Sequence, residues 1–76
     1  MTRPADVFVM IKGNITGRDT DKAIQMLVQE VAGVVLEEES LQWFPFSMVQ
    51  KIFRNKGEKP DEMFVKQWIL EQKGMI

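Results

Sequence analysis

The 76-residue sequence contains neither cysteine nor histidine. Without cysteine the chain has no disulfide bonds and no thiolate metal sites. Without histidine it lacks the most common general base of enzymes. Ser40 and Ser47 are the only serines, and neither lies in a Gly-x-Ser-x-Gly motif. We therefore expect a protein that is not an enzyme and that holds no cofactor.

The sequence also lacks a long apolar segment. No apolar run approaches the roughly 20 residues of a membrane span, and the run at residues 7–11 is too short for the core of a signal peptide. We expect a cytoplasmic protein with no membrane partner. The sequon at residues 14–16 is not expected to be glycosylated without a signal peptide.

No strong excess of charge of one sign is present, because the net charge is −1. Residues 1–45 have four basic and seven acidic side chains, whereas residues 46–76 have six basic and four acidic ones. The second half is thus mildly basic, without the strongly basic surface of a dedicated duplex-DNA-binding protein.

What the sequence does contain is enough apolar material for one small folded domain, residues 1–76. Hydrophobic residues make up 45% of the chain, and a domain of this size needs most of its large apolar side chains in the core. The aromatic residues expected there are Trp43, Phe44 and Trp68. Phe46 follows Pro45 in a turn, so an exposed Phe46 would mark a contact surface.

Several segments have the composition of strands. Residues 6–12 predict a strand that turns at Gly13-Asn14 into residues 15–18, and Gly17 indicates a bulge. Further strands are expected at 34–36, 41–44 and 49–54, with Pro45 ending the second and a loop over 56–61.

Residues 20–31 fit either a helix or a strand. Ile24, Leu27 and Val28 recur at helical spacing, and Thr20 or Asp21 would cap such a helix. Ile24, Met26 and Val28 also alternate as in a strand, so periodicity alone favours the helix only slightly.

The last segment predicts a helix that places Val65, Trp68 and Ile69 on one face. Gly74 has the position of a residue that ends a helix. We expect Trp68 to join this helix to the rest of the core.

Three motifs resemble a signature of small uncharacterised phage and plasmid proteins. They are the upstream run Thr20-Asp21-Lys22-Ala23-Ile24, the run Trp43-Phe44-Pro45-Phe46-Ser47-Met48-Val49 and the closing run from Trp68-Ile69 to Lys73-Gly74, and the resemblance covers about residues 18–76. It implies a small antiparallel sheet closed by a C-terminal helix, with residues 20–28 as a strand. The sequence departs from the pattern at residues 29–40, which look longer than the usual turn, and at Phe46.

The predicted fold class is therefore α+β, a small twisted antiparallel sheet with one C-terminal helix. The alternative is a mostly helical domain formed by residues 20–36, 46–56 and 61–73.

One carboxylate pattern resembles a metal site. Asp19, Asp21 and Glu30 match positions 1, 3 and 12 of a calcium-binding loop. Ala23 occupies the place of a further ligand and Ile24 that of the glycine that the loop geometry needs. We expect no metal site.

Two groups of residues are candidates for binding. Phe46 and the acidic run Glu37, Glu38 and Glu39 are candidates for docking on a protein, since the run can match a basic partner. The basic residues around Phe53 are candidates for single-stranded nucleic acid, because such sites combine cations for phosphates with a ring for base stacking. These residues are Lys51, Phe53, Arg54, Lys56 and Lys59.

The favoured hypothesis is a non-catalytic, phage-encoded protein-binding module that acts in the host cytoplasm. It would dock on a host or phage protein and modulate host nucleic-acid or defence machinery as an inhibitor. The alternatives are a single-stranded nucleic-acid-binding module that uses residues 51–59 and a minor structural or assembly protein.

Overall fold

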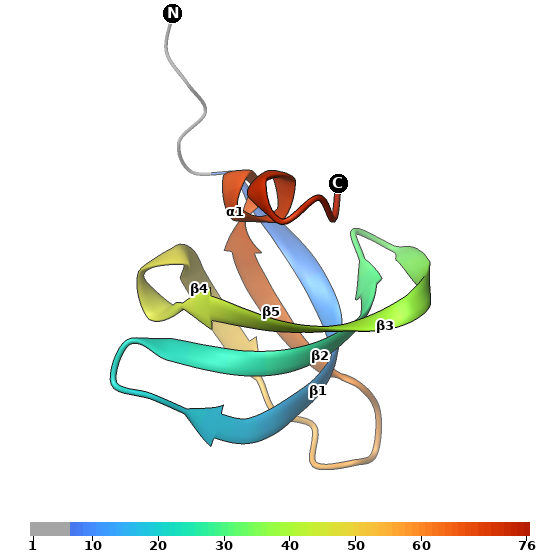
Figure 1. Cartoon of the computed structure of the whole chain (residues 1–76). Helices are drawn as coiled ribbons and strands as arrows, with labels where there is room; N and C mark the ends of the chain where they lie inside the picture. Colours follow the sequence, from blue (N-terminus) through green and yellow to red (C-terminus); the bar gives the residue numbers. More distant parts are fainter. Residues whose placement is uncertain (1–6) are drawn as a thin grey trace, which may run out of the picture.

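The computed structural model describes residues 7–76, which form a five-stranded antiparallel sheet with a short C-terminal helix (Figure 1). The elements are β1 (Phe8–Asp19), β2 (Ala23–Val31), β3 (Val34–Pro45), the 3-10 helix η1 (Phe46–Met48), β4 (Val49–Phe53), β5 (Asp61–Lys66) and α1 (Gln67–Gln72). Their order in the sheet is β3-β2-β1-β5-β4. The predicted α+β class is confirmed, and the mostly helical alternative is wrong.

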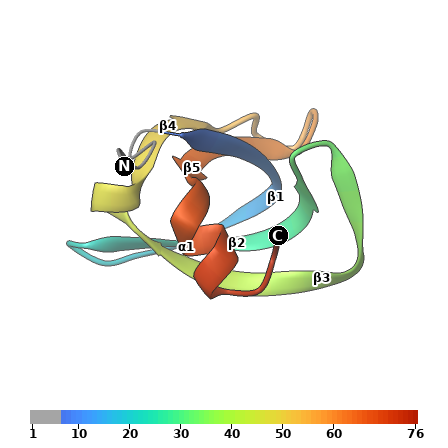
Figure 2. The same cartoon turned by 90° about the horizontal axis from the view of Figure 1, so that it is seen from above.

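The sheet is strongly curled. Its two edge strands, β3 and β4, are connected by only the three residues of η1, so the end of β3 and the start of β4 must meet. Seen from above, the strands enclose a central space that α1 covers (Figure 2). The Phe46 N–H donates to the Lys22 carbonyl at 2.8 Å, which ties η1 to the turn between β1 and β2.

The core lies inside this curl and has members from β1, β2, β3, β5 and α1. Its buried side chains are Ile11, Ile24, Met26, Val28, Val31, Phe44, Met63, Val65 and Leu70. Ile24, Met26 and Val28 alternate along β2, so residues 23–31 follow the strand pattern and residues 20–22 form the turn before it. The slight preference for a helix there is wrong, because burial against two neighbouring strands outweighs a weak local periodicity.

β1 continues through Gly13 and Asn14, so the hairpin predicted at these residues is wrong. Lys12 pairs with Glu30 and Gly13 with Val28, which leaves one extra residue, Gln29, on β2. A Cβ atom at Gly13 would overlap the Leu27 carbonyl oxygen. Glycine is required here for the close approach of two backbones rather than for a turn.

Gly17 occupies the irregular site that the sequence predicts for it. The register of β1 against β2 shifts between Ile15 and Asp19, and Gly17 lies within that interval with φ of 84°. The left-handed backbone at this point favours glycine over other residues.

The C-terminal helix is shorter than expected, because Val65 belongs to β5. Leu70 is the buried residue of α1, whereas Trp68 is only half-buried and lies outside the core cluster. The prediction of Trp68 as the core anchor is therefore wrong. Gly74, with φ of 72°, ends the helix as predicted, and the Met75 N–H donates to the Leu70 carbonyl at 2.9 Å in a Schellman-type arrangement.

Replacement of Leu70 with Ala is expected to destabilise the domain by about 2–5 kcal/mol, the range for deleting a buried leucine side chain. Trp68→Ala is the matched comparison on the same helix. It is expected to lower the free energy of unfolding by less than Leu70→Ala does, because Trp68 is partly exposed. Urea unfolding followed by circular dichroism measures both. A larger loss for Trp68→Ala would contradict the assignment of Leu70 as the anchor.

Replacement of Gly13 with Ala is expected to separate β1 from β2 locally and to cost about 1–3 kcal/mol or more, as overpacking does. Asn14→Ala, at the neighbouring exposed position, provides the control and should change stability little. Equal unfolding midpoints for the two variants would show that the backbones do not approach closely at Gly13.

Candidate functional site

The outward-facing side chains of the sheet form two surfaces on opposite sides of the curl. The first, here called the β2–β3 face, has exposed apolar residues and the acidic run. The second, here called the β4–β5 face, has aromatic and basic residues. In the view from above, β3 lies on one side of the central space and β4 and β5 lie on the other (Figure 2). The uneven distribution of charge along the sequence thus becomes a separation of charge in space.

The acidic run of the β2–β3 face lies in a bulge of β3. Val28 pairs with Ser40, and Glu30 pairs with Val35, so Gln29 alone faces four residues of β3. Glu37, Glu38 and Glu39 lie among these four and are all exposed. Residues 29–40, which look longer than a usual turn in the sequence, therefore form the end of β2, a two-residue turn at 32–33 and the bulged first half of β3, and the acidic run is part of the sheet edge.

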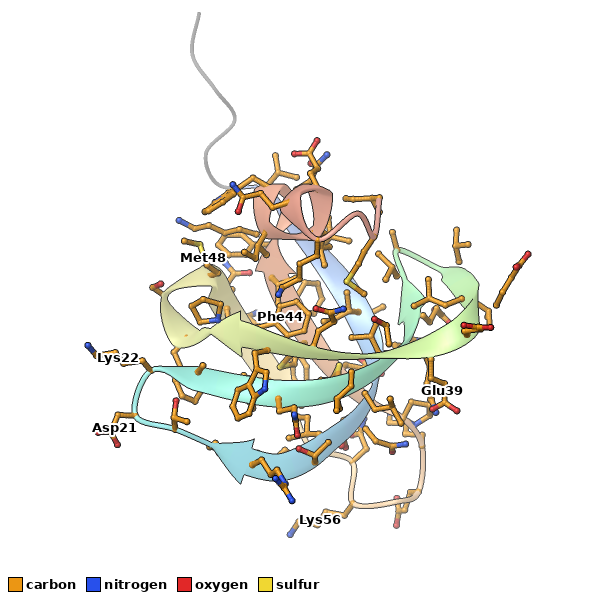
Figure 3. The ribbon with its side chains drawn as sticks, viewed as in Figure 1. Asp21, Lys22, Glu39, Phe44, Met48 and Lys56 are labelled. Atoms are coloured by element: carbon orange, nitrogen blue, oxygen red, sulfur yellow. The ribbon has the colours of Figure 1, made fainter. Side chains whose placement is uncertain are left out.

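Glu39 differs from the other two acidic residues. Its Oε2 accepts a hydrogen bond of 3.0 Å from Nε2 of Gln29, across the bulge. In Figure 3, Glu39 points outward from β3, whereas Phe44 points into the enclosed core. Glu37 and Glu38 therefore offer the freer charge to a partner.

Apolar side chains continue the β2–β3 face beyond the acidic bulge. Leu41 is 55% exposed and Trp43 39% exposed, and both point away from the core because Phe44 points into it. They lie opposite Leu27 and Gln25 of β2, and Gln25 is held by a hydrogen bond of 2.7 Å from Oγ1 of Thr16. This hydrogen bond supports the surface on which Trp43 lies.

Phe46, the aromatic candidate for protein docking, is 36% exposed at the start of η1. Phe46 is therefore exposed, which is the condition under which the sequence made it a candidate contact residue. It lies seven residues beyond Glu39, a separation of about 23 Å along an extended strand. The structure therefore does not bring Phe46 and the acidic run together directly; Leu41 and Trp43 lie between them.

The β4–β5 face carries the candidates for nucleic-acid binding. Lys51 and Phe53 are both exposed and point outward from β4, on either side of the half-buried Ile52. Lys51 lies opposite Phe64 of β5, and the Phe53 and Phe64 rings meet edge to face with their centroids 6.3 Å apart. Phe53 is 45% exposed and lies outside the core cluster.

The other basic candidates follow β4 in the loop to β5. Arg54 is exposed, and its Nη2 lies 3.4 Å from Oδ2 of Asp19 in an ion pair. Lys56 and Lys59 are exposed in the same loop. The structure therefore places these three near the end of the β4–β5 face, with Arg54 already paired.

Asp61 fixes the loop that carries these basic residues. Its Oδ1 accepts a hydrogen bond of 2.7 Å from the Asn55 N–H, and its Oδ2 accepts one of 3.0 Å from the Ile15 N–H. Asn55 also donates through Nδ2 to the Pro60 carbonyl at 2.8 Å. One carboxylate thus connects the loop to β1.

The expectation that Trp43 lies in the core is wrong, and Leu41, Phe64 and Lys66 were not among the candidates for binding. The period of two along a strand indicates that only one of two adjacent large residues faces the core, but not which one. Trp43 neighbours Phe44, and Phe64 lies between Met63 and Val65, both of which are buried.

The three carboxylates of the calcium-loop pattern do not converge. Asp19 pairs with Ile24 at one end of β2, whereas Glu30, near the other end, makes an ion pair of 3.9 Å with Lys12. Over residues 7–76, no group of three acidic, histidine or cysteine side chains is placed to hold a metal ion. In the same part of the chain, no helix is long and apolar enough to cross a membrane.

Comparison of the chain with protein-family models, curated proteins and solved structures found no match in any of the three. The resemblance to small phage and plasmid proteins therefore stays a prediction, and the functional argument depends on the two surfaces.

Removal of the Asp61 carboxylate is expected to loosen the β4–β5 loop. Asp61→Ala leaves two backbone N–H groups without their acceptor and should lower the free energy of unfolding by about 1–3 kcal/mol. Asp61→Asn retains one acceptor oxygen and should cost less. Hydrogen exchange at Asn55 and Ile15 measures the local effect, and Glu58→Ala, an exposed change in the same loop, is the control. Unchanged exchange at both amides in Asp61→Ala would contradict the proposed role.

Proposed function

We propose that this chain is a non-catalytic protein-binding module that docks through its β2–β3 face. The observation that carries the proposal is the exposure of Leu41 and Trp43 beside the acidic bulge. The partner would offer an apolar patch to these two side chains and basic groups to Glu37 and Glu38.

The distribution of exposed apolar residues supports a binding role for this face. Eight large apolar side chains are exposed among residues 7–76, and five of them belong to β3 or η1. These five are Val34, Val35, Leu41, Trp43 and Phe46. Because a 76-residue domain needs most of its large apolar side chains inside, their concentration on one edge is typical of an interaction site.

The acidic bulge also argues against self-association through β3. Antiparallel pairing of β3 with β3 of a second copy would bring the acidic residues at the middle of each strand close together. Like charges placed opposite each other destabilise a strand pair, and bulges and charges are common means of protecting a sheet edge. The expected partner is therefore a different protein with a basic surface.

The resemblance to phage and plasmid proteins narrows this proposal. A nucleic-acid-binding or defence protein of the host has the basic surface that Glu37, Glu38 and Glu39 would occupy. In this proposal the chain inhibits such a protein by covering its phosphate-binding groups.

Affinity capture from nuclease-treated cell lysate tests the proposal. The wild-type chain should retain a partner protein that is released as salt is raised, since the contact is partly electrostatic. Glu37→Lys with Glu38→Lys should abolish capture. Leu41→Ser should reduce the free energy of binding by about 1–3 kcal/mol if Leu41 is buried in the complex.

Two matched variants control for nonspecific effects. Ile76→Ser changes an exposed apolar residue outside the face, and Lys51→Glu with Lys59→Glu reverses two exposed charges on the opposite side. Both should retain the partner. Capture that is lost after nuclease treatment, or that survives the Glu37 and Glu38 reversals, would rule the proposal out.

A further inference from the structure

We propose that the β4–β5 face is a binding site for single-stranded nucleic acid. Bases would stack on Phe53 and Phe64, and phosphates would lie against Lys51 and Lys66. This site is independent of the proposed protein contact, because the β2–β3 face lies on the other side of the curl (Figure 2).

The two rings are arranged as a platform. Phe53 is 45% exposed although it touches Phe64 edge to face, with an interplanar angle of 75°. An edge-to-face pair leaves ring surface uncovered, and neither side chain belongs to the core cluster. Outward-facing rings on adjacent strands, here the exposed Phe53 and the half-buried Phe64, provide stacking surfaces for successive bases, which is the sequence-tolerant part of single-strand recognition.

Cationic side chains flank the rings in register. Lys51 lies directly opposite Phe64 on the neighbouring strand. Lys66 follows Phe64 by two residues on β5, so it points to the same side of the sheet, about 6.6 Å further along. A backbone that crosses the rings would therefore have an ammonium group on each side of Phe64.

The surface is also continuous with β1. Met10 lies opposite Phe64, and Phe8 lies opposite Lys66. Both are half-buried and point outward, because Val9 packs against the core and Ile11 belongs to it. Three adjacent strands thus present an apolar and aromatic strip that is bordered by lysines.

Glu62 sets the limit of this strip. It lies opposite Phe53 on β4 and opposite Lys12 on β1. Lys12 is itself paired with Glu30, so at this end of the face the strands β1 and β5 offer no free positive charge, and the lysines there belong to the β4–β5 loop. The nucleic acid is expected to run from Lys66 past Phe64 and Lys51 toward the loop that carries Lys56.

Single strands fit this face better than a duplex does. Among residues 7–76 the only α-helix is the six-residue α1, and β4 and β5 are joined by a loop of mixed charge. A duplex site requires an element that enters a groove and an extensive basic surface. Exposed rings have no use on intact duplex, whose bases are stacked on each other, but they can stack on the bases of a single strand.

Fluorescence anisotropy with a labelled oligothymidylate of about 15 nucleotides tests the proposal, with the matched duplex as the comparison. The single strand should bind more tightly than the duplex at low salt. If three or four phosphates are neutralised, the plot of log K against log salt should have a slope of about −2 to −3.

Two variants separate the contribution of charge from that of stacking. Lys51→Glu with Lys66→Glu should weaken binding at least tenfold and make the slope shallower by about 1.4, or 0.7 for each lost phosphate contact. Arg54 is left intact because its reversal would also break the ion pair with Asp19. Phe53→Leu keeps an apolar side chain and should weaken binding by roughly 5- to 150-fold with an unchanged slope, the effect of losing one stacked base.

Glu37→Lys with Glu38→Lys is the control on the opposite side and should not weaken binding. Circular dichroism checks that each variant keeps the fold. The proposal is overturned if the oligothymidylate does not bind at the lowest salt, if the duplex binds as tightly, or if Phe53→Leu binds as tightly as the wild-type chain. Failure here leaves the protein contact of the β2–β3 face untouched, since that contact is measured after nuclease treatment.

Discussion

The short connection between the edge strands is the constraint on which the rest of the structure depends. Three residues of η1 join β3 to β4, although three other strands separate them in the sheet. The sheet must therefore curl until its edges approach, and the hydrogen bond from Phe46 to Lys22 holds the corner in place. Curling gives a small chain an enclosed core with only one layer of sheet, and α1 covers the opening through Leu70.

Because the sheet is curled, alternate side chains along each strand point either into the enclosed core or outward to solvent. Phe44 faces in and Trp43 faces out, and Met63 and Val65 face in while Phe64 faces out. Composition, Pro45 and Gly74 predicted strands within β1, β3 and β4 and the end of the helix, whereas the residues of β5 were not predicted as a strand and β2 was left between helix and strand. The sequence did not predict which aromatic side chains point into the core and which point to solvent. When two adjacent residues are both large, either one can be the buried one until pairing with the neighbouring strands fixes the register. That single ambiguity hid Trp43 and Phe64 from the candidate surfaces.

The remaining errors share another cause, which is that the decisive contact is distant in sequence. Gly13 has the composition of a turn, but the nearby Leu27 carbonyl explains its lack of a side chain. The acidic run has the composition of a solvated loop, but Gln29 across the bulge holds it in the sheet edge. Trp68 is larger than Leu70, yet the direction in which α1 leaves β5 buries the smaller residue. Local propensity is a weak guide wherever cross-strand contacts decide the outcome.

The net charge is only −1, although acidic residues on β3 and basic residues on the β4–β5 face lie on different sides of the molecule. Glu39 lies about 23 Å along β3 from Phe46, where the chain passes toward β4, and this separation is more than twice the Debye length of about 8 Å at physiological ionic strength. Acidic residues on β3 therefore do little to weaken the attraction of a phosphate to Lys51 on the other side of the curl. In the two proposals each surface meets its partner through its own local charge, so the proposed protein contact and the proposed nucleic-acid contact are compatible in one small domain. Because the curl places β3 on one side of the core and β4 and β5 on the other (Figure 2), the fold that buries the core also separates the two charged surfaces.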